Sequence, residues 1–420
     1  MQIKRDWSQP FFSSRRRRRW GGRLLLLYGL ALGGFLLFVN TQFDRLQLAA
    51  LDMVGMAPTP TPFASWWASR GYELFLAGDL EDAAAAFAQA VEQQPANVDY
   101  LYEYGRLLIE INKPGYPQQA ADLGDAAIQA APNDPRGYAL KAKALVWQGE
   151  SAAAVPVALT GLELNPNYAP LHAVLARAYT TIGRYQQGIS FGESAVELDP
   201  MDVDARRAYA YSLIWVGRRE EAINELEDAV VINPNLTAPY FELAAQYIAQ
   251  NEYERAVATY ERVLSLEPFN TRALLRLCET FSRVGQDGQA QGYCEDALNL
   301  DPNYAEAYRQ LGMVQYRRRN YEGAIENFNR CVNLGSSEIQ CYYLRGLAHY
   351  YLGQCDDAWT TLQEALARIQ ELPVKEPILS ETQEGLRLVT VSCPAYSGQA
   401  LPTPIPPTAI PPTPLGGIGG

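Results

Sequence analysis

The sequence has 420 residues, a formal net charge of −12 and 48% hydrophobic residues, which is enough chain for two or three ordinary domains. The excess of acidic residues argues against a nucleic-acid partner, because binding to phosphates needs a basic surface. The charge is uneven, since residues 1–23 hold eight basic residues against one acidic residue, Asp6, and the rest of the chain carries −19.

An apolar segment follows this basic tail. Residues 24–43 contain no charged side chain, and about twenty helical residues span the hydrocarbon core of a bilayer. We therefore expect a transmembrane helix over 24–43. The arginine run Arg15–Arg19 should keep the N-terminus cytoplasmic, which places the rest of the chain outside the cell membrane. A cleaved signal peptide is the alternative, although no small-x-small cleavage pattern follows Val39.

Residues 44–63 are predicted to be a linker. In its second half Pro58, Pro60 and Pro62 alternate with threonine. Such a pattern favours an extended polyproline-II spacer, which would hold the following residues away from the membrane.

A 34-residue unit organises residues 64–372 and is clearest from Thr237 to Asn270. Its first half has apolar residues at i, i+3, i+4 and i+7, which is the spacing of one helical face. These residues are Tyr240, Leu243, Ala244 and Tyr247, and a second face holds Tyr253, Ala256, Tyr260 and Val263. Pro268 ends the unit, because proline cannot continue a helix. Each unit is therefore predicted to be a hairpin of two short helices.

Three columns of the unit recur along the chain. The proline column holds Pro95, Pro132, Pro166, Pro200, Pro234, Pro268 and Pro302. The Ala256 column holds Ala83, Ala120, Ala154, Gly188, Ala222, Ala290, Ala324 and Ala358, and the Ala244 column holds Gly71, Gly105, Ala142, Ala176, Ala210, Cys278, Gly312 and Gly346. This pattern resembles the tetratricopeptide-repeat family. The resemblance implies an all-α fold, a right-handed superhelix (α-solenoid) of about nine units.

The chain after the repeats divides into two parts. Residues 373–394 are predicted to contain a capping helix, since a solenoid needs a cover for its last apolar face. Residues 395–420 are rich in proline, threonine and glycine, a composition typical of a disordered, extended tail. This tail could be a wall-crossing spacer, a glycosylated stalk or an inert end.

All six cysteines fall within residues 278–393. Two occupy facing columns of one hairpin, two join the end of one unit to the start of the next, and two join the ninth unit to the region after the capping helix. We therefore predict the disulfides Cys278–Cys294, Cys331–Cys341 and Cys355–Cys393, which suit an oxidising compartment. Six buried thiols are the alternative, and six cysteines permit fifteen pairings.

One short pattern suggests chemistry. Gly188–Gly192 reads G-x-S-x-G, but a nucleophile elbow needs a strand before the serine, and here the motif lies inside a predicted repeat helix. No phosphate-binding loop or dinucleotide fingerprint occurs, and His172 and His349 fall in columns that the family fills with packing residues. We therefore predict no catalytic residue, no cofactor and no metal site.

The family resemblance implies that the first helix of each unit lines a concave groove that binds a partner. The side chains expected in this groove are Tyr102, Arg106, Lys143, Trp147, Arg177, Arg207, Tyr211, Trp215, Phe241, Arg272, Arg283, Arg309, Tyr316, Arg317 and Tyr343. Arginine beside exposed aromatic residues is common at binding hot spots. The alternative is that these aromatic rings only pack against neighbouring helices.

The groove columns carry nine basic residues against five acidic ones, although the body is acidic. We therefore expect an extended protein segment that is acidic or ends in a free carboxylate. The chain resembles a membrane-anchored bacterial scaffold or adaptor, displayed outside the cell membrane for envelope, secretion or surface assembly. The alternative is a polysaccharide-binding or export accessory protein. An enzyme is the third possibility, and only Gly188–Gly192 would support it.

Overall fold

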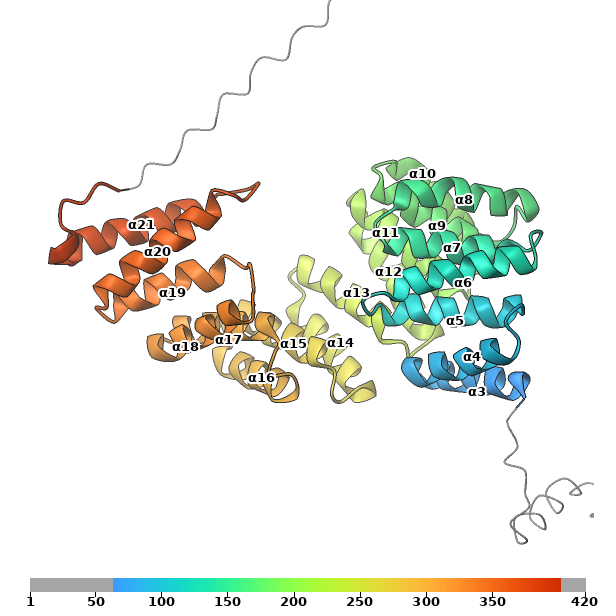
Figure 1. Cartoon of the computed structure of the whole chain (residues 1–420), viewed down its shortest axis with the longest axis horizontal. Coiled ribbons are helices and arrows are strands. Elements are labelled where there is room, and N and C mark those ends of the chain that lie inside the picture. Colours follow the sequence, from blue (N-terminus) through green and yellow to red (C-terminus); the bar gives the residue numbers. More distant parts are fainter. Residues whose placement is uncertain (1–62, 402–420) are drawn as a thin grey trace, which may run out of the picture. The chain divides into compact units, whose positions relative to one another are not determined.

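The computed structural model describes residues 63–401, so the predicted basic tail, transmembrane helix and most of the linker lie outside the described residues, as do residues 402–420. Between residues 63 and 401 the chain forms nineteen α-helices, one short 3-10 helix and no strand (Figure 1). None of these helices is both long and apolar enough to cross a membrane. The described residues from Trp67 to Leu401 belong to one compact unit, and all contacts below lie within it.

The helices are short and similar in length. They are α3 (Ala64–Ala77), α4 (Leu80–Gln93), α5 (Val98–Ile111), α6 (Tyr116–Ala130), α7 (Pro135–Trp147), α8 (Ser151–Leu164), α9 (Ala169–Thr181), α10 (Tyr185–Leu198), α11 (Val203–Trp215), α12 (Arg219–Ile232), α13 (Thr237–Ala249), α14 (Tyr253–Leu266), α15 (Thr271–Arg283), α16 (Asp287–Leu300), α17 (Ala305–Arg317), α18 (Tyr321–Asn333), α19 (Gln340–Tyr351), α20 (Cys355–Ile369) and α21 (Ile378–Ser392), followed by the 3-10 turn Pro394–Tyr396.

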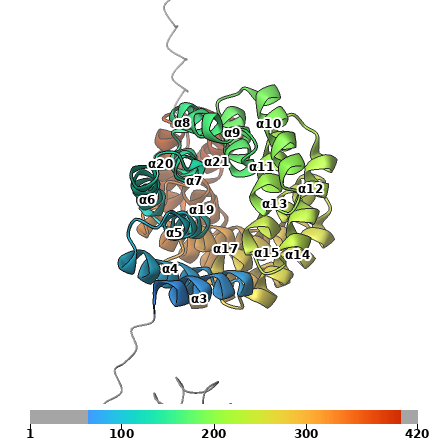
Figure 2. The same cartoon turned by 90° about the vertical axis from the view of Figure 1, so that its right-hand side faces the viewer.

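Successive helices pair as hairpins, and each hairpin packs on the next. Every odd-numbered helix from α5 to α19 contacts the even-numbered helix that follows it. The odd-numbered helices also touch one another along the chain, as in the pairs α5–α7, α7–α9, α9–α11, α15–α17 and α17–α19. In Figure 2 the odd-numbered helices from α5 to α15 face inward and the even-numbered ones lie outside them. The predicted all-α repeat solenoid is thus confirmed.

A left-handed residue separates the two helices of every unit between α3 and α20. The residues with positive φ at this position are Gly78, Asn112, Gly149, Gly183, Gly217, Asn251, Gly285, Arg319 and Gly353. A residue in this conformation stops a helix and lets its last carbonyls be capped. Six of the nine are glycine, which adopts positive φ without steric cost.

The first helix of several units begins at a polar cap. Asn97, Asp134, Asp202 and Asn270 each accept a hydrogen bond from a backbone N–H in the first turn of α5, α7, α11 and α15. These residues stand two residues after the recurring proline. The proline ends one unit and the cap starts the next, so the pair marks the boundary between units.

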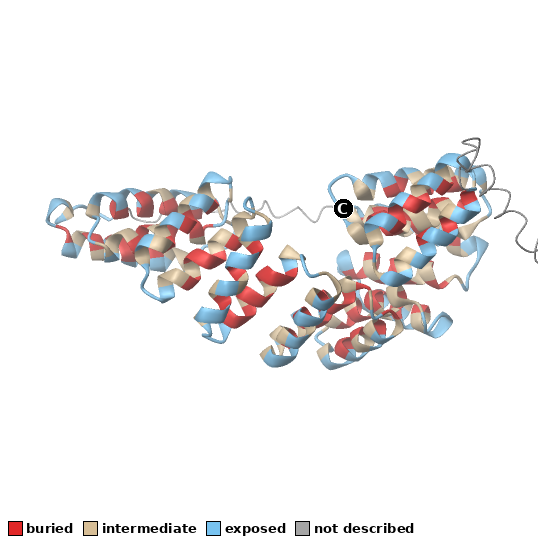
Figure 3. Ribbon diagram, turned by 90° about the horizontal axis from the view of Figure 1, so that it is seen from below, coloured by how far each residue is buried: buried red, intermediate tan, exposed pale blue. Residues whose placement is uncertain are grey.

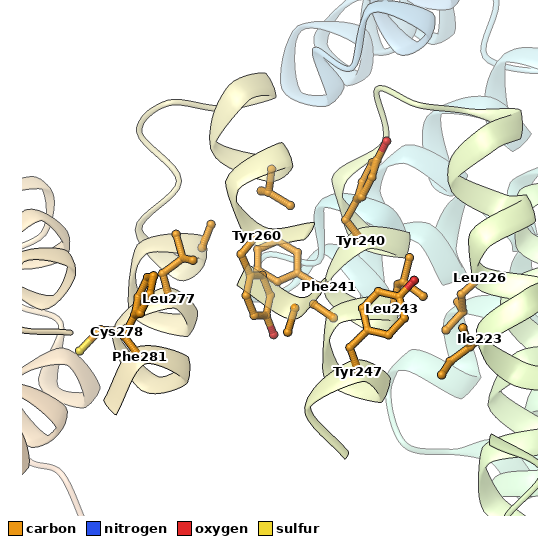
Figure 4. Packing of buried hydrophobic residues seen from close by; sticks show 14 of the residues in the cluster. Ile223, Leu226, Tyr240, Phe241, Leu243, Tyr247, Tyr260, Leu277, Cys278 and Phe281 are labelled. Carbon is orange, nitrogen blue, oxygen red and sulfur yellow. The ribbon is translucent and has the colours of Figure 1, made fainter. Parts of the chain in front are cut away.

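The core follows the small-residue columns. Every residue of the Ala256 and Ala244 columns is buried, because the two helices of a hairpin approach each other there. Figure 3 shows the buried residues along the facing sides of the helices. Figure 4 shows larger side chains filling the space around them, with Tyr240, Leu243 and Tyr247 of α13 packed toward Ile223 and Leu226 of α12.

The six cysteines pair as predicted. The structure contains the disulfides Cys278–Cys294, Cys331–Cys341 and Cys355–Cys393. The first joins α15 to α16, the second joins α18 to α19, and the third ties the start of α20 to the residue after α21. Helix α21 packs on α19 and α20 and buries Leu386 and Val389, so it covers the end of the array.

Candidate functional site

The inner helices surround an open cavity of about 740 Å³. Its lining comes mainly from α5, α7, α9, α11, α13 and the start of α15, with Asn112 after α5 and Leu226 of α12. Six residues expected in the groove take part: Trp147, Arg177, Arg207, Tyr211, Phe241 and Arg272. The first helix of each unit therefore supplies the concave surface, and these six side chains are brought together.

Arg207 lies at the centre of an ion network rather than on an open surface. Its Nη1 donates to both carboxylate oxygens of Glu110, at 3.0 and 2.9 Å, and its Nε and Nη2 donate to Glu242, at 3.0 and 2.9 Å. The side chain is only 6% exposed. Arg207 lines the cavity as expected, but its guanidinium already donates to two carboxylates, so its role in partner binding stays a prediction.

This network crosses the inside of the superhelix. Glu110 belongs to the second unit and Arg207 to the fifth, so the contact joins residues 97 positions apart. A second cross-contact links Lys143 Nζ to Asp204 Oδ2 at 2.5 Å. A third joins the Asn235 side-chain amide to the Leu76 carbonyl at 2.8 Å. The first five units are thus held in a closed turn by polar contacts.

Two aspartates at the start of α11 respond to this environment in opposite directions. Burial and the nearby Asp204 charge raise the pKa of Asp202 to about 6. Burial also acts to raise the pKa of Asp204, but the attraction of Lys143, Arg207 and Arg106 outweighs it and lowers that pKa. Asp204 is therefore the ionised partner of the cations, whereas the charged form of Asp202 is destabilised by its burial.

Among the described residues, Arg177 faces the cavity and forms only a long ion pair, with Glu242. Its guanidinium lies 4.5 Å from the Trp147 ring centroid and 4.7 Å from that of Tyr211. Glu242 is 3.9 Å away, beyond hydrogen-bonding distance. Burial lowers the pKa of Arg177, Glu242 acts against this shift, and the neighbouring Arg207 charge lowers the pKa further.

The third arginine of the cavity lining is Arg272. It is exposed, and its guanidinium lies 4.3 Å from the centroid of the Phe241 ring. Phe241 itself is buried and packs on Tyr260. Its ring therefore packs in the core and also contacts Arg272 at the cavity.

A smaller space of about 390 Å³ lies beside the first cavity, lined by Tyr102 and Arg106 together with the start of α11. Arg106 forms an ion pair with Glu103 at 2.6 Å and lies over the Phe75 ring. Lys143 lies 5.7 Å from the Trp147 ring. These expected groove residues do face inward, but their charges are paired.

The remaining expected residues lie outside the cavity lining. Arg309 pairs with Glu279 and Glu306, and Arg317 pairs with Asp287 at 2.5 Å. Arg283 is exposed. The net positive charge expected for the groove is therefore smaller than the sequence suggested, because most of its cations form ion pairs with acidic residues.

The expected aromatic residues outside the cavity differ in their exposure and their contacts. Trp215 is 53% exposed and stacks on Tyr185. Tyr316 contacts Tyr321 and Tyr351, and these last two rings stack at 4.9 Å. Tyr343 is buried, so it serves packing rather than an open surface.

Glu242 was missed as a site residue, although it holds Arg207 and approaches Arg177. It follows Phe241 directly, and its position in the repeat was not among those expected to line the groove. The G-x-S-x-G pattern lies inside α10, where Gly188 and Gly192 are buried against neighbouring helices and Ser190 is exposed. No strand precedes this serine within the described residues, so the geometry is that of a packed helix.

Comparisons with known proteins agree with this architecture. Two tetratricopeptide-repeat family models match residues 69–135 and 240–268, and the model for anaphase-promoting complex, cyclosome, subunit 3 matches residues 284–365. Tetratricopeptide repeats generally mediate binding between proteins.

Curated relatives match over short stretches. The co-chaperone sgt12 of Aspergillus fumigatus is 31% identical over 83 residues, 20% of this chain and 24% of that protein. The lipoprotein NlpI homolog of Haemophilus influenzae is 32% identical over 74 residues, 18% of this chain and 24% of that protein. The chain spans between 12% and 24% of the length of the curated relatives that it matches.

Among solved structures, one chain of the APC/C hetero-tetramer Cut9-Hcn1 aligns with a TM-score of 0.48 and 15% identity, covering 76% of each chain. Tetratricopeptide-repeat models thus match two parts of the chain, and the described residues have the helical hairpins and small-residue columns of this repeat.

Proposed function

We propose that this protein is a scaffold or adaptor that binds an extended segment of a partner protein in the cavity between α5 and α15. The observation that carries the proposal is the cavity itself, about 740 Å³ in volume and lined by Trp147, Arg177 and Tyr211. The Arg207 network holds the surrounding helices together, so the surface is formed before a partner arrives. A preformed surface loses less conformational entropy on binding.

A protein segment suits this cavity better than a sugar chain. Binding of a glycan would need open aromatic faces for stacking. Arg177 lies over Trp147 and Tyr211, and Arg272 lies over Phe241, so cations already occupy these rings. A peptide can instead offer acceptors to the arginines and apolar side chains to the ring edges.

The proposal includes display outside the cell membrane, for envelope, secretion or surface assembly. Two observations support this location. The apolar segment 24–43 follows a basic tail, and three disulfides form most readily in an oxidising compartment. One matched relative is named a lipoprotein. Protease treatment of intact cells should remove a tag placed after Gly420, and full protection of that tag in cells with a permeable outer layer would contradict the location.

Affinity capture from cells tests the binding role. Full-length protein should retain its partner, and Trp147→Ala combined with Tyr211→Ala should release it, because both side chains line the cavity. Phe269→Ala is a matched control, since this aromatic side chain is 79% exposed and lies outside the cavity lining. A partner that is retained equally by the double variant would place the binding surface elsewhere.

A further inference from the structure

We propose that the proline-rich tail of this chain, residues 402–414, binds to a tyrosine cluster in the last units of the same chain. The tyrosine cluster consists of Tyr316 of α17, Tyr321 of α18 and Tyr350 and Tyr351 of α19. None of these four residues lines the cavity between α5 and α15. The inference therefore concerns a second surface and goes beyond the proposed function.

The four rings form one continuous aromatic surface. Tyr321 and Tyr351 stack with their centroids 4.9 Å apart, and Tyr316 packs edge-on against both, at 5.6 and 6.1 Å. Tyr350 contacts Tyr351 at 5.4 Å. Tyr351 is 52% exposed, and the other three residues are partly buried. The cluster therefore presents aromatic surface to solvent.

The repeat does not require tyrosine at these positions. Three members of the cluster have polar counterparts in the preceding unit, which are Ser282, Asp287 and Arg317 in the places of Tyr316, Tyr321 and Tyr351. There Arg317 Nη2 donates to Ser282 Oγ and to Asp287 Oδ1, each at 2.5 Å. A polar network thus satisfies the same junction between units, so helix packing alone does not account for an exposed group of tyrosines.

The tail has the composition that suits an aromatic surface. Residues 402–414 contain seven prolines and no charged side chain, which favours the polyproline-II conformation. Such a segment loses little conformational entropy when it binds to clustered aromatic rings, because its backbone is already extended. Its carbonyls make no internal hydrogen bonds, so tyrosine hydroxyls can donate to them.

The last helix brings the end of the described chain close to the cluster. The hydroxyl oxygens of Tyr350 and Ser392 share a hydrogen bond of 3.1 Å. Leu401 lies nine residues beyond Ser392, which is at most about 30 Å of extended chain. Residues 402–414 span about 40 Å as a polyproline-II helix. They are therefore long enough to return to the cluster.

The covalent connection favours the tail over a separate ligand. A segment joined to its site by a short connection has an effective concentration on the order of millimolar. A contact with a Kd of about 0.1 mM as a separate peptide is then mostly occupied within the chain. A second copy at micromolar concentration competes poorly with it, so the occupant is the tail of the same chain.

Photo-crosslinking of purified full-length protein tests the inference. A benzoylphenylalanine at Ile410, in the middle of the tail, should attach to α17, α18 or α19 on irradiation, as mass spectrometry of the peptides will show. An equal mixture of isotope-labelled and unlabelled chains identifies the occupant. Each crosslinked peptide pair should carry one isotope, because the tail binds within its own chain. Pairs of mixed isotope would assign the cluster to a second copy and overturn the inference.

The preceding unit supplies a matched variant. Tyr316→Ser with Tyr321→Asp and Tyr351→Arg replaces the rings by the polar network that this chain already forms one unit earlier, and it should lower the crosslink yield at least about 10-fold. Tyr185→Ala with Trp215→Ala is the control. This exposed stack occupies the equivalent positions four units earlier, and its loss should leave the yield unchanged.

A change confined to the tail remains informative if the triple variant melts below wild type. Pro406→Ala, Pro407→Ala, Pro411→Ala and Pro412→Ala together remove the preformed backbone without altering any described residue, and they should lower the yield at least about 3-fold. An undiminished yield in this variant, or in a triple variant that melts as wild type, would overturn the inference. Attachment that is absent, or scattered over the helices from α3 to α16, would overturn it too.

Discussion

Replacing Arg207 by glutamine removes the cation that joins the second, fifth and sixth units. Four hydrogen bonds of 2.9–3.0 Å to Glu110 and Glu242 are lost. Glu110 is only 8% exposed, so its carboxylate stays buried without a partner. Breaking a buried ion pair in this way costs about 3–5 kcal/mol, and we expect that loss in the free energy of unfolding of the first six units.

Urea denaturation at neutral pH measures this change, and hydrogen exchange locates it. Faster exchange is expected in α5 and α11, which lose their connection across the turn, and little change is expected in the disulfide-bonded units after α15. Arg218→Gln is the control, because Arg218 and Glu221 form an exposed ion pair on the outer side and its loss should leave stability unchanged.

The reasoning also predicts how the cost can be reversed. Replacing Arg207, Glu110 and Glu242 together by methionine removes all three charges of the network and should recover most of the lost stability. If Arg207→Gln lowers the free energy of unfolding by less than about 1 kcal/mol and leaves hydrogen exchange in α5 unchanged, the network does not hold the turn closed.

Three further changes test other features. Asp202→Asn keeps the side-chain oxygen that caps α11 and removes a carboxylate whose pKa is raised to about 6. Because the folded chain binds the extra proton, the stability of the wild-type protein should fall as pH rises from about 4 to 6. In thermal melts across pH, the variant should be more stable than wild type at pH 8 by at most about 3 kcal/mol and equally stable below pH 4. Cys355→Ser with Cys393→Ser opens a closure of 38 residues, which should cost about 4 kcal/mol and expose the connection before α21 to limited proteolysis. Gly192→Ala places a Cβ 2.9 Å from the Tyr209 Cα and should lower the melting temperature, whereas Gly292→Ala meets nothing within 4 Å and should raise it slightly; equal effects of the two alanines would contradict the close packing of α10 on α11.

The features that sequence could predict are local and periodic. The Ala244 and Ala256 columns mark where two adjacent helices touch, and every member is buried. Two of the disulfides were predictable for the same reason, since Cys278–Cys294 and Cys331–Cys341 join cysteines whose positions in adjacent helices follow from the repeat. Pairing Cys278 with Cys294 needs only the geometry of one hairpin.

The Arg207 network could not be predicted in this way. Its contact with Glu110 spans 97 residues and depends on how far each unit rotates relative to the last. Small rotations add up over three units, and a single repeat does not encode their sum. The burial of Phe241 and Tyr343 was missed for a related reason, because an inner column meets the neighbouring unit as well as the groove.

The central claim is that the cavity between α5 and α15 is the surface that binds a protein partner. The most direct measurement is photo-crosslinking in intact cells, with a photoreactive side chain at Tyr211, which lines the cavity, and separately at Glu261, which is exposed on the outer helix α14. Mass spectrometry of the crosslinked product should find one protein segment attached at Tyr211, absent at Glu261 and absent when Trp147 is alanine. The same protein attached equally at both positions, or only glycan attached at Tyr211, would contradict the claim.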